Sequence, residues 1–144
     1  MTYLLDTNVI SEWALPRQNR GVERWLRVTP GEELFLSILS VAEIRFGIEC
    51  MAPGRRRAEL DTWLTDQLLP YFAGRLLTMD EDTAFAWARI LADGKKAGRP
   101  VEIIDGFLAA TAERHDLTVV TRNTRHFEVW GGPVLNPWSA DPPA

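Results

Sequence analysis

LTVVTRN, residues 117–123, is the stretch of sequence that decides the fold. Its first four residues show little polar alternation, which is typical of a strand buried on both faces, and the polar TRN that follows indicates where the strand ends. Sheets with two buried faces are mostly parallel, and helices cover them on both sides. The stretch therefore predicts a buried parallel strand within a larger α/β fold.

Other short apolar runs fit the remaining strands of such a sheet. They lie at residues 2–5, at 34–38, in a weaker run at 75–79, and at Val134 and Leu135. Apolar residues recur between them at the three- and four-residue spacing of a helix; the sets are Val41, Ile44 and Ile48, then Leu60, Leu64 and Leu68 beside Trp63, then Phe85, Ala88, Leu91 and Ala92. DGFLAATAERH, from Asp105, adds a helix of small residues. We expect an α/β fold, a three-layer α/β/α sandwich with a central, mainly parallel sheet.

Length and composition indicate one globular domain. The chain has 144 residues, of which 46% are apolar and 25% charged, and no linker or repeat divides it. We expect a domain over residues 1–138 and a frayed tail over 139–144, where Pro142 and Pro143 lie.

Charge and cysteine usage exclude several classes. Sixteen Lys and Arg against twenty Asp and Glu give a net charge of −4, which argues against bulk nucleic-acid binding but leaves room for a local basic patch. Cys50 is the single cysteine, so an internal disulfide and a thiolate-rich zinc site are excluded. No run approaches the ~18 apolar residues of a membrane span. The acidic residues Asp6 and Glu12 lie where a signal peptide would be basic and then apolar. We expect a cytoplasmic protein.

Polar residues follow the predicted strands where helices or turns begin. Asp6 follows the first strand, Glu43 lies in the first turn after the second, Asp105 begins the small-residue helix, and Asn123 closes the LTVVTRN strand. Because the carboxyl ends of parallel strands meet at one edge of a sheet, we expect these side chains to converge. Carboxylates drawn together repel one another, and a bound cation offsets that cost.

The expected ion is Mg²⁺, with Mn²⁺ as a substitute, because Asp6, Glu43 and Asp105 offer only oxygen ligands. Such an ion polarises a phosphodiester and activates water for in-line attack. With Asn123 beside them, the three acids are the candidate catalytic residues, and the predicted reaction is phosphodiester hydrolysis.

Each of these residues also has a structural interpretation. Asp6 and Asp105 could cap or begin helices, and Asn123 could belong to a turn. Glu43 follows Ser40 in the S-x-x-E spacing of a capping box, in which the glutamate returns a hydrogen bond to the cap residue. The coincidence of all four at successive junctions favours a functional site.

Candidate substrate contacts lie close to the acids in sequence. Arg45, Thr121, Arg122 and Arg125, together with His126, could hold the phosphates of a single-stranded substrate. The tryptophans, Trp138 among them, more often serve packing than base stacking. Neither GxGxxG nor a Walker sequence occurs, so a nucleotide cofactor is not indicated.

The pieces LLDTNVISE, LSILSVAEIRFGI, IIDGFLAATA and LTVVTRNTRHF, in this order, resemble the PIN-domain ribonucleases, and more closely the VapC and FitB-like toxins of bacterial toxin–antitoxin pairs. The resemblance runs from Tyr3 to Trp138. It implies that Asp6, Glu43 and Asp105 form the metal-binding acidic site. Family members often add a fourth carboxylate after the last core strand, where this chain has Asn123 and, before Phe127, His126. A second metal would therefore be held less tightly.

The resemblance further implies a magnesium-dependent endoribonuclease toxin that inhibits translation or growth and is held inactive by a small antitoxin. It also implies a homodimer within a larger complex that contacts DNA through the antitoxin. Residues 41–51 and 60–72 could supply apolar surface for these contacts.

Three other functions share parts of this pattern. A haloacid-dehalogenase phosphatase needs a second acid where this chain has Asn8, and a receiver-type signalling domain needs a lysine after a late strand, where TRN offers none. A PIN module that acts only as a binding or co-repressor partner of an antitoxin stays open, because Asn123 leaves three acids.

Overall fold

The computed structural model describes residues 1–139, and strands and helices alternate along them. In chain order the elements are β1 (Tyr3–Leu5), α1 (Thr7–Trp13), α2 (Arg20–Val28), the 3₁₀ turn η1 (Gly31–Glu33), β2 (Leu34–Ser37), α3 (Ile38–Glu49), α4 (Arg55–Trp63), the π-helical turn η2 (Leu64–Leu68), α5 (Leu69–Tyr71), β3 (Leu76–Leu77), α6 (Glu81–Lys96), α7 (Ile103–His115), β4 (Thr118–Val120), the 3₁₀ turn η3 (Thr124–Phe127) and β5 (Val134–Leu135). The predicted strands are all present, most of them one or two residues shorter than expected.

The five strands form one parallel sheet in the order β3-β2-β1-β4-β5. β1 lies at its centre, with Leu4 opposite Phe35 of β2 and Val119 of β4. From β1 the chain builds outward to β2 and β3, then returns to place β4 on the other side of β1. The carboxyl ends of β1 and β4 are therefore the topological switch point, where ligands bind in open α/β sheets.

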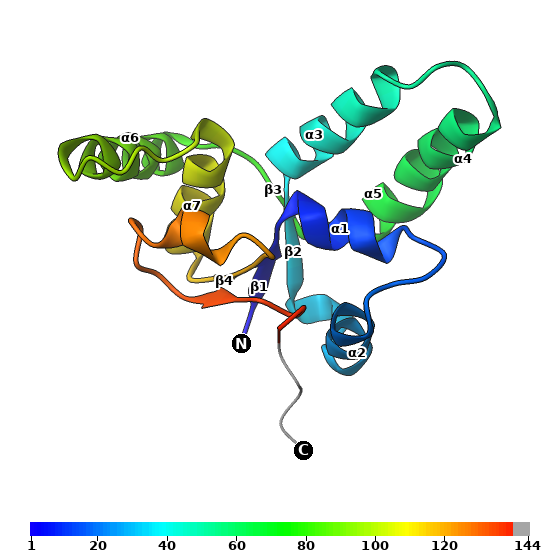
Figure 1. The fold of residues 1–144 in the computed structure, drawn as a ribbon, viewed down its shortest axis with the longest axis horizontal. Helices are drawn as coiled ribbons and strands as arrows, with labels where there is room; N and C mark the ends of the chain where they lie inside the picture. The colour runs from blue at the N-terminus through cyan, green and yellow to red at the C-terminus, as the bar shows by residue number, and fades with distance from the viewer. Residues whose placement is uncertain (140–144) are drawn as a thin grey trace.

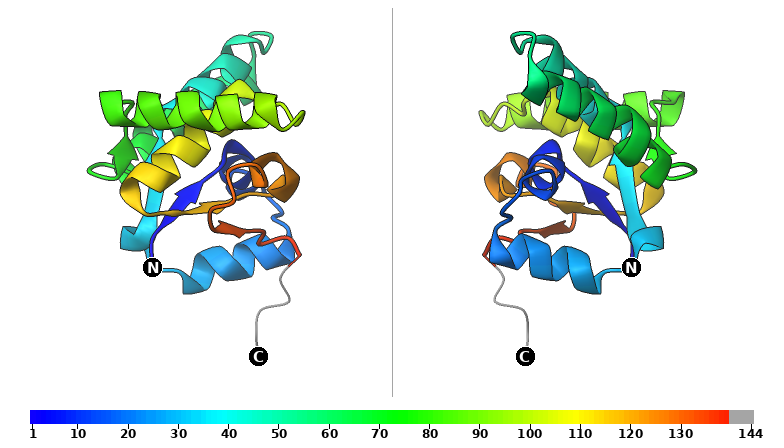
Figure 2. Two further views of the ribbon diagram at one scale, coloured as in Figure 1. Left: turned by 90° about the vertical axis from the view of Figure 1, so that its left-hand side faces the viewer. Right: turned by 90° about the vertical axis from the view of Figure 1, so that its right-hand side faces the viewer.

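Helices cover both faces of the sheet, which confirms the three-layer sandwich (Figure 1). Neighbouring β1 residues point to opposite faces. Leu5 packs with Val9, Ile48 and other residues of α1 to α5, whereas Leu4 packs with Leu108 and other residues of α6, α7 and η3. Figure 2 shows α2 at the end of the molecule opposite α6.

Two details of the helices differ from the predictions. In α6 the buried face runs through Thr83, Ile90 and Gly94, and Phe85 is 67% exposed. Apolar spacing alone misplaced this face, because a small residue at Gly94 allows the Arg99 and Val101 backbone to approach. α2, whose last residue Val28 is 70% exposed, is absent from the predicted elements.

The expected tail over residues 139–144 lies outside the described residues except for Ser139, whose hydroxyl donates to the Asn136 carbonyl (3.3 Å). No helix in the described part of the chain is long and apolar enough to cross a membrane.

Candidate active site at the carboxyl edge of the sheet

Asp6 lies at the switch point between β1 and β4. It is buried (7% exposed) and is the N-cap of α1, with its Oδ1 accepting from the backbone N of Thr7 (2.6 Å). Its Oδ2 accepts from the hydroxyl of Thr121, the residue after β4 (2.7 Å). Burial raises the pKa of Asp6, and the hydrogen bonds from Thr121 and Thr7 oppose that shift. The capping role and the site role therefore coexist in this residue.

Glu43 reaches the same place from α3. The hydroxyl of Thr7 donates to its Oε1 (2.8 Å). Burial raises the pKa of Glu43 against this hydrogen bond, and the charges of Asp6 and Glu102 add to the rise. Glu43 thus faces the Asp6 carboxylate across the Thr7 side chain.

The capping-box interpretation of Glu43 is wrong. The N-cap of α3 is Ser37, whose Oγ accepts from the backbone N of Leu39 (3.1 Å). Ser40 is buried inside the helix, and its hydroxyl has no partner within residues 1–139. Because α3 begins three residues earlier than the capping box implies, Glu43 lies in its second turn rather than its first.

Asp105 approaches from α7, on the other side of the sheet. Its Oδ2 lies 2.8 Å from Nδ1 of His126 in η3. Burial is the largest cause that raises the pKa of Asp105 to about 6, followed by the charges of Asp6 and Glu102, while His126 lowers it. Burial and the neighbouring negative charges thus together disfavour the ionised form of Asp105.

Glu102 is the member of this group that sequence reasoning missed. α7 begins at Ile103 rather than at Asp105, and Glu102 is its N-cap, with Oε2 accepting from the backbone N of Asp105 (2.9 Å). Its charge raises the pKa of Asp6, Glu43 and Asp105 alike. The available signal was an acid three residues before Asp105. Sequence reasoning misses it because Asp, Asn, Ser and Thr are the preferred N-cap residues, and Glu is not among them.

These side chains line one open cleft of about 590 Å³. Its residues come from the ends of β1 and β4, from α1, α3 and α7, from η3 and from the segment after β5: Asp6, Thr7, Asn8, Ser11, Glu12, Leu15, Glu43, Glu102, Ile104, Asp105, Arg122, Asn123, His126 and Trp138. Asn123 is exposed in this cleft, and its backbone N donates to the Thr121 hydroxyl (3.0 Å). The cleft therefore gathers Asp6, Glu43, Asp105 and Asn123, as the sequence predicts.

The candidate substrate contacts divide into three groups. Arg122 lines the cleft, and Arg125 lines a neighbouring hollow that shares Asp105 and His126 with it. Thr121 is fully buried, so it can hold Asp6 but cannot touch a substrate.

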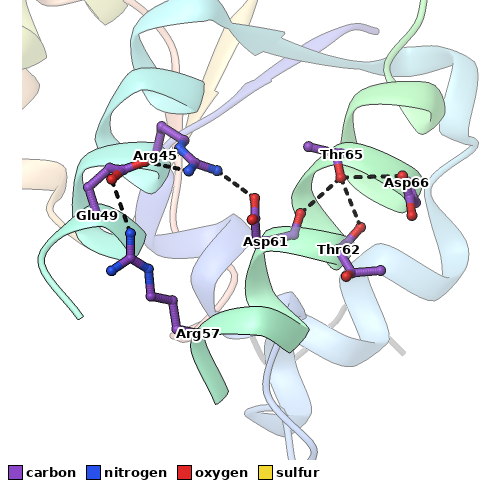
Figure 3. A network of polar contacts seen from close by, with 7 residues as sticks. All are labelled: Arg45, Glu49, Arg57, Asp61, Thr62, Thr65 and Asp66. Atoms are coloured by element: carbon purple, nitrogen blue, oxygen red, sulfur yellow. Dashed lines mark hydrogen bonds and ion pairs between the residues drawn. The ribbon is translucent and has the colours of Figure 1, made fainter. Parts of the chain in front are cut away.

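Arg45 lies outside the cleft. It pairs with Glu49 on α3 and with Asp61 on α4 (Nη1 to Oδ1, 2.6 Å), and Glu49 also pairs with Arg57 (3.1 Å) (Figure 3). Arg45 therefore links α3 to α4 through its ion pair with Asp61, and the structure does not bring it to the predicted site.

The PIN-domain family model matches residues 3–131. The chain belongs to the PIN-domain family. Among relatives of this PIN domain, the toxin FitB of Neisseria gonorrhoeae is 42% identical over 94% of this chain and 97% of its own. The VapC ribonuclease Y4jK of Sinorhizobium fredii is 41% identical over 94% and 96%. The solved structure of FitAB bound to the IR36 DNA fragment has a TM-score of 0.92 at 39% identity, covering 98% of this chain and 99% of that one.

The cleft of this PIN domain offers the oxygen ligands that a hard divalent cation prefers. Burial raises the pKa values of Asp6, Glu43 and Asp105, and the charge of Glu102 adds to each rise, a cost that a cation would relieve. Within residues 1–139, no three Asp, Glu, His or Cys side chains are placed to ligate one ion together. Mg²⁺ keeps several waters and binds through one or two carboxylates, so the donor set fits an ion held in that manner.

Proposed function

We propose that this PIN domain, within residues 1–138, is the toxin of a toxin–antitoxin pair and a divalent-metal-dependent endoribonuclease. One observation carries the proposal: Asp6, Glu43, Glu102 and Asp105 line a single cleft at the switch point of the sheet. FitB and Y4jK, named as a toxin and a ribonuclease, align over nearly their whole lengths, which supports both parts. The RNA that it cuts and the site of its action are then cytoplasmic.

The residues divide the work by their surroundings. Asp6 and Asp105 are the buried carboxylates, so they would hold Mg²⁺ or Mn²⁺. When bound, that ion polarises the scissile phosphodiester and lowers the pKa of an attacking water. Thr121 and Thr7 orient Asp6 and Glu43, and Glu43 and Glu102, which are more accessible than Asp6 and Asp105, would accept the proton of that water. Asn123 can orient the water through its amide without adding charge.

A small antitoxin protein is the proposed partner. An apolar groove of about 280 Å³ runs beside the cleft and shares Thr7 and Glu43 with it. Its apolar lining comes from the two stretches that the sequence singled out: Ile44, Ile48, Met51, Leu60 and Trp63. A segment docked there would block the cleft, and DNA contact would pass through this partner; the similar FitAB complex, solved bound to the IR36 DNA fragment, supports a DNA-binding assembly. We also propose a homodimer within the larger complex.

Cleavage of total cellular RNA by antitoxin-free protein tests the activity. The reaction is run with Mg²⁺, with Mn²⁺ and with EDTA, beside Asp6→Asn, which keeps an N-cap acceptor while removing the charge. We expect discrete metal-dependent fragments, and a rate at least about a hundredfold lower in the variant because several kcal/mol of charge stabilisation are lost. Asp66→Asn, on the exposed surface of η2 (Figure 3), is the matched control and should cleave like wild type.

If wild type and Asp6→Asn were equally inert with both metals while the protein still bound an antitoxin, the catalytic proposal would fail. The alternative of a binding or co-repressor module would then hold.

A further inference from the structure

Arg122 and Trp138 form a pair at the rim of the acidic cleft. The guanidinium carbon of Arg122 lies over the indole of Trp138, 5.5 Å from the ring centroid, and both side chains line the cleft. A cation within about 6 Å of an aromatic face is attracted to it electrostatically. The indole therefore fixes where the positive charge of Arg122 lies.

Both members of the pair are anchored. The backbone N of Arg122 donates to Asn8 Oδ1 (3.4 Å), and the Asn8 amide donates to the hydroxyl of Thr121, which holds Asp6. The position of Arg122 is thus tied to the position of the central carboxylate.

Trp138 is held by close packing of the segment before it. Its backbone N donates to Asn136 Oδ1 (2.9 Å), and its ring packs against the core beneath α1 and α2. Pro137 is buried against Gly21 at the start of α2, where an added Cβ would lie 2.3 Å from the Pro137 carbonyl oxygen. Only glycine permits this approach, so the backbone just before Trp138 is packed closely against the start of α2.

The charge around the pair defines what it can bind. Arg122 is the one arginine or lysine among the described residues that line the cleft, which also holds Asp6, Glu12, Glu43, Glu102 and Asp105. Within residues 1–139 its guanidinium makes no ion pair with a carboxylate. Arginine presents its N–H donors at the edge of the guanidinium plane, so contact between its face and an aromatic ring leaves donors for a phosphate.

We propose that Arg122, positioned by Trp138, is a subsite for a backbone phosphate of single-stranded RNA next to the bond that is cut. This deepens the proposed function and rests on it. The subsite supplies positive charge at the edge of a cleft that would otherwise repel the substrate. Trp138 is then a positioning residue that acts through Arg122, rather than a packing residue alone.

Binding of a fluorescently labelled single-stranded RNA oligonucleotide to the full-length protein in EDTA, measured by anisotropy over a range of salt concentrations, tests Arg122 without cleavage. Arg122→Gln should raise Kd about tenfold, the loss of one charge-assisted contact. It should also reduce the slope of log Kd against log salt by about 0.7, the value for one phosphate contact on a single strand.

Arg27→Gln is the matched control, because Arg27 lies on α2 in a hollow with Tyr3 and Leu135, outside the acidic cleft. It makes the same change in net charge and should leave both Kd and slope near wild type.

The positioning role of Trp138 must be tested with a measurement that loss of packing alone would leave unchanged. We expect Trp138→Leu to raise KM for RNA cleavage several-fold with kcat within about twofold, and Trp138→Phe, which keeps an aromatic face, to restore most of KM. In the Arg122→Gln background, Trp138→Leu should raise Kd no further, because a positioning residue has nothing left to position. Thermal unfolding confirms that each variant is folded at the assay temperature.

The outcomes separate the two proposals. RNA cleavage by wild type, together with an Arg122→Gln variant that matches Arg27→Gln in Kd and slope, would overturn the subsite and leave the ribonuclease standing. Binding with the expected slope change but without metal-dependent cleavage would support Arg122 as a phosphate contact for RNA but contradict the ribonuclease, and with it the placement of that contact next to a bond that is cut. Absence of any RNA binding by wild type would overturn the subsite directly.

Discussion

The pKa of Asp105 reflects its burial and the negative charges of the cleft around it. Its pKa rises to about 6 because of burial and the charges of Asp6 and Glu102. In the unfolded chain the same carboxyl has its ordinary value of 3.8. Between these values the folded protein binds more protons than the unfolded one, so the free energy of unfolding falls as pH rises from about 4 to about 6. At pH 7 the full cost is present.

We therefore expect Asp105→Asn to stabilise the metal-free protein at pH 7, by on the order of 1 kcal/mol, since one pKa unit corresponds to about 1.4 kcal/mol and partial exposure screens part of it. The gain should vanish at pH 4, where the wild-type carboxyl is protonated. Urea unfolding in EDTA at a series of pH values measures it.

Asp80→Asn supplies a control of opposite sign. Hydrogen bonds from the side chain and backbone N of Thr83 lower the pKa of Asp80. Its replacement should destabilise the protein at neutral pH, with an effect that shrinks as the pH falls toward the lowered pKa. A stabilisation by Asp105→Asn that is the same at pH 4 and pH 7 would contradict the role given to its charge.

Strand positions could be predicted from the sequence more reliably than helix starts, and this limited which site residues could be identified. The strand that precedes each acid could be predicted, because apolar runs such as 117–120 stand out. Helix starts were not, because Ser37, Ser40, Glu102 and Asp105 are all plausible first-turn residues and only packing selects among them. The sequence therefore predicts Glu43 as a site residue but leaves a capping box open as its alternative, and it gives no role to Glu102.

Glu102 and Asp80 make a second comparison, since both are acidic N-caps but only Glu102 lies in the cleft. We expect Glu102→Asn, which keeps a cap acceptor, to weaken binding of Mn²⁺ several-fold, because it removes one charge from the group that attracts the ion. Mn²⁺ titration followed by electron paramagnetic resonance measures free and bound ion directly. Asp80→Asn should bind Mn²⁺ like wild type, and an equal loss in both variants would show that helix capping, not cleft charge, is responsible.

At the scale of the molecule, the sequence predicted the layers and the edge of the sheet where the site lies, but not the contacts across it. Alternating strands and helices were enough for the parallel sandwich. Arg45 lies only two residues from Glu43, yet successive helix positions point in different directions, and Asp61 on α4 holds it away from the cleft. Trp138 was assigned to packing for the converse reason, because the approach of Pro137 to Gly21 joins segments far apart in the chain.

The cleft joins both sides of the sheet, so relief of its charge should stabilise the molecule as a whole. Asp6 and Glu43 come from one layer and Glu102 and Asp105 from the other, and the unfolded chain has no such convergence.

A ligand that binds only the folded state stabilises it by RT ln(1 + [L]/Kd). For Mg²⁺ or Mn²⁺ at about ten times its Kd this is roughly 1.4 kcal/mol, which raises Tm by about 5 °C for a chain of this size. Thermal unfolding at pH 7 should show this rise over EDTA in wild type and little or none in Asp6→Asn. Asp66→Asn should respond like wild type, and equal Tm values with metal and with EDTA would mean that the acids do not act together as a cation site.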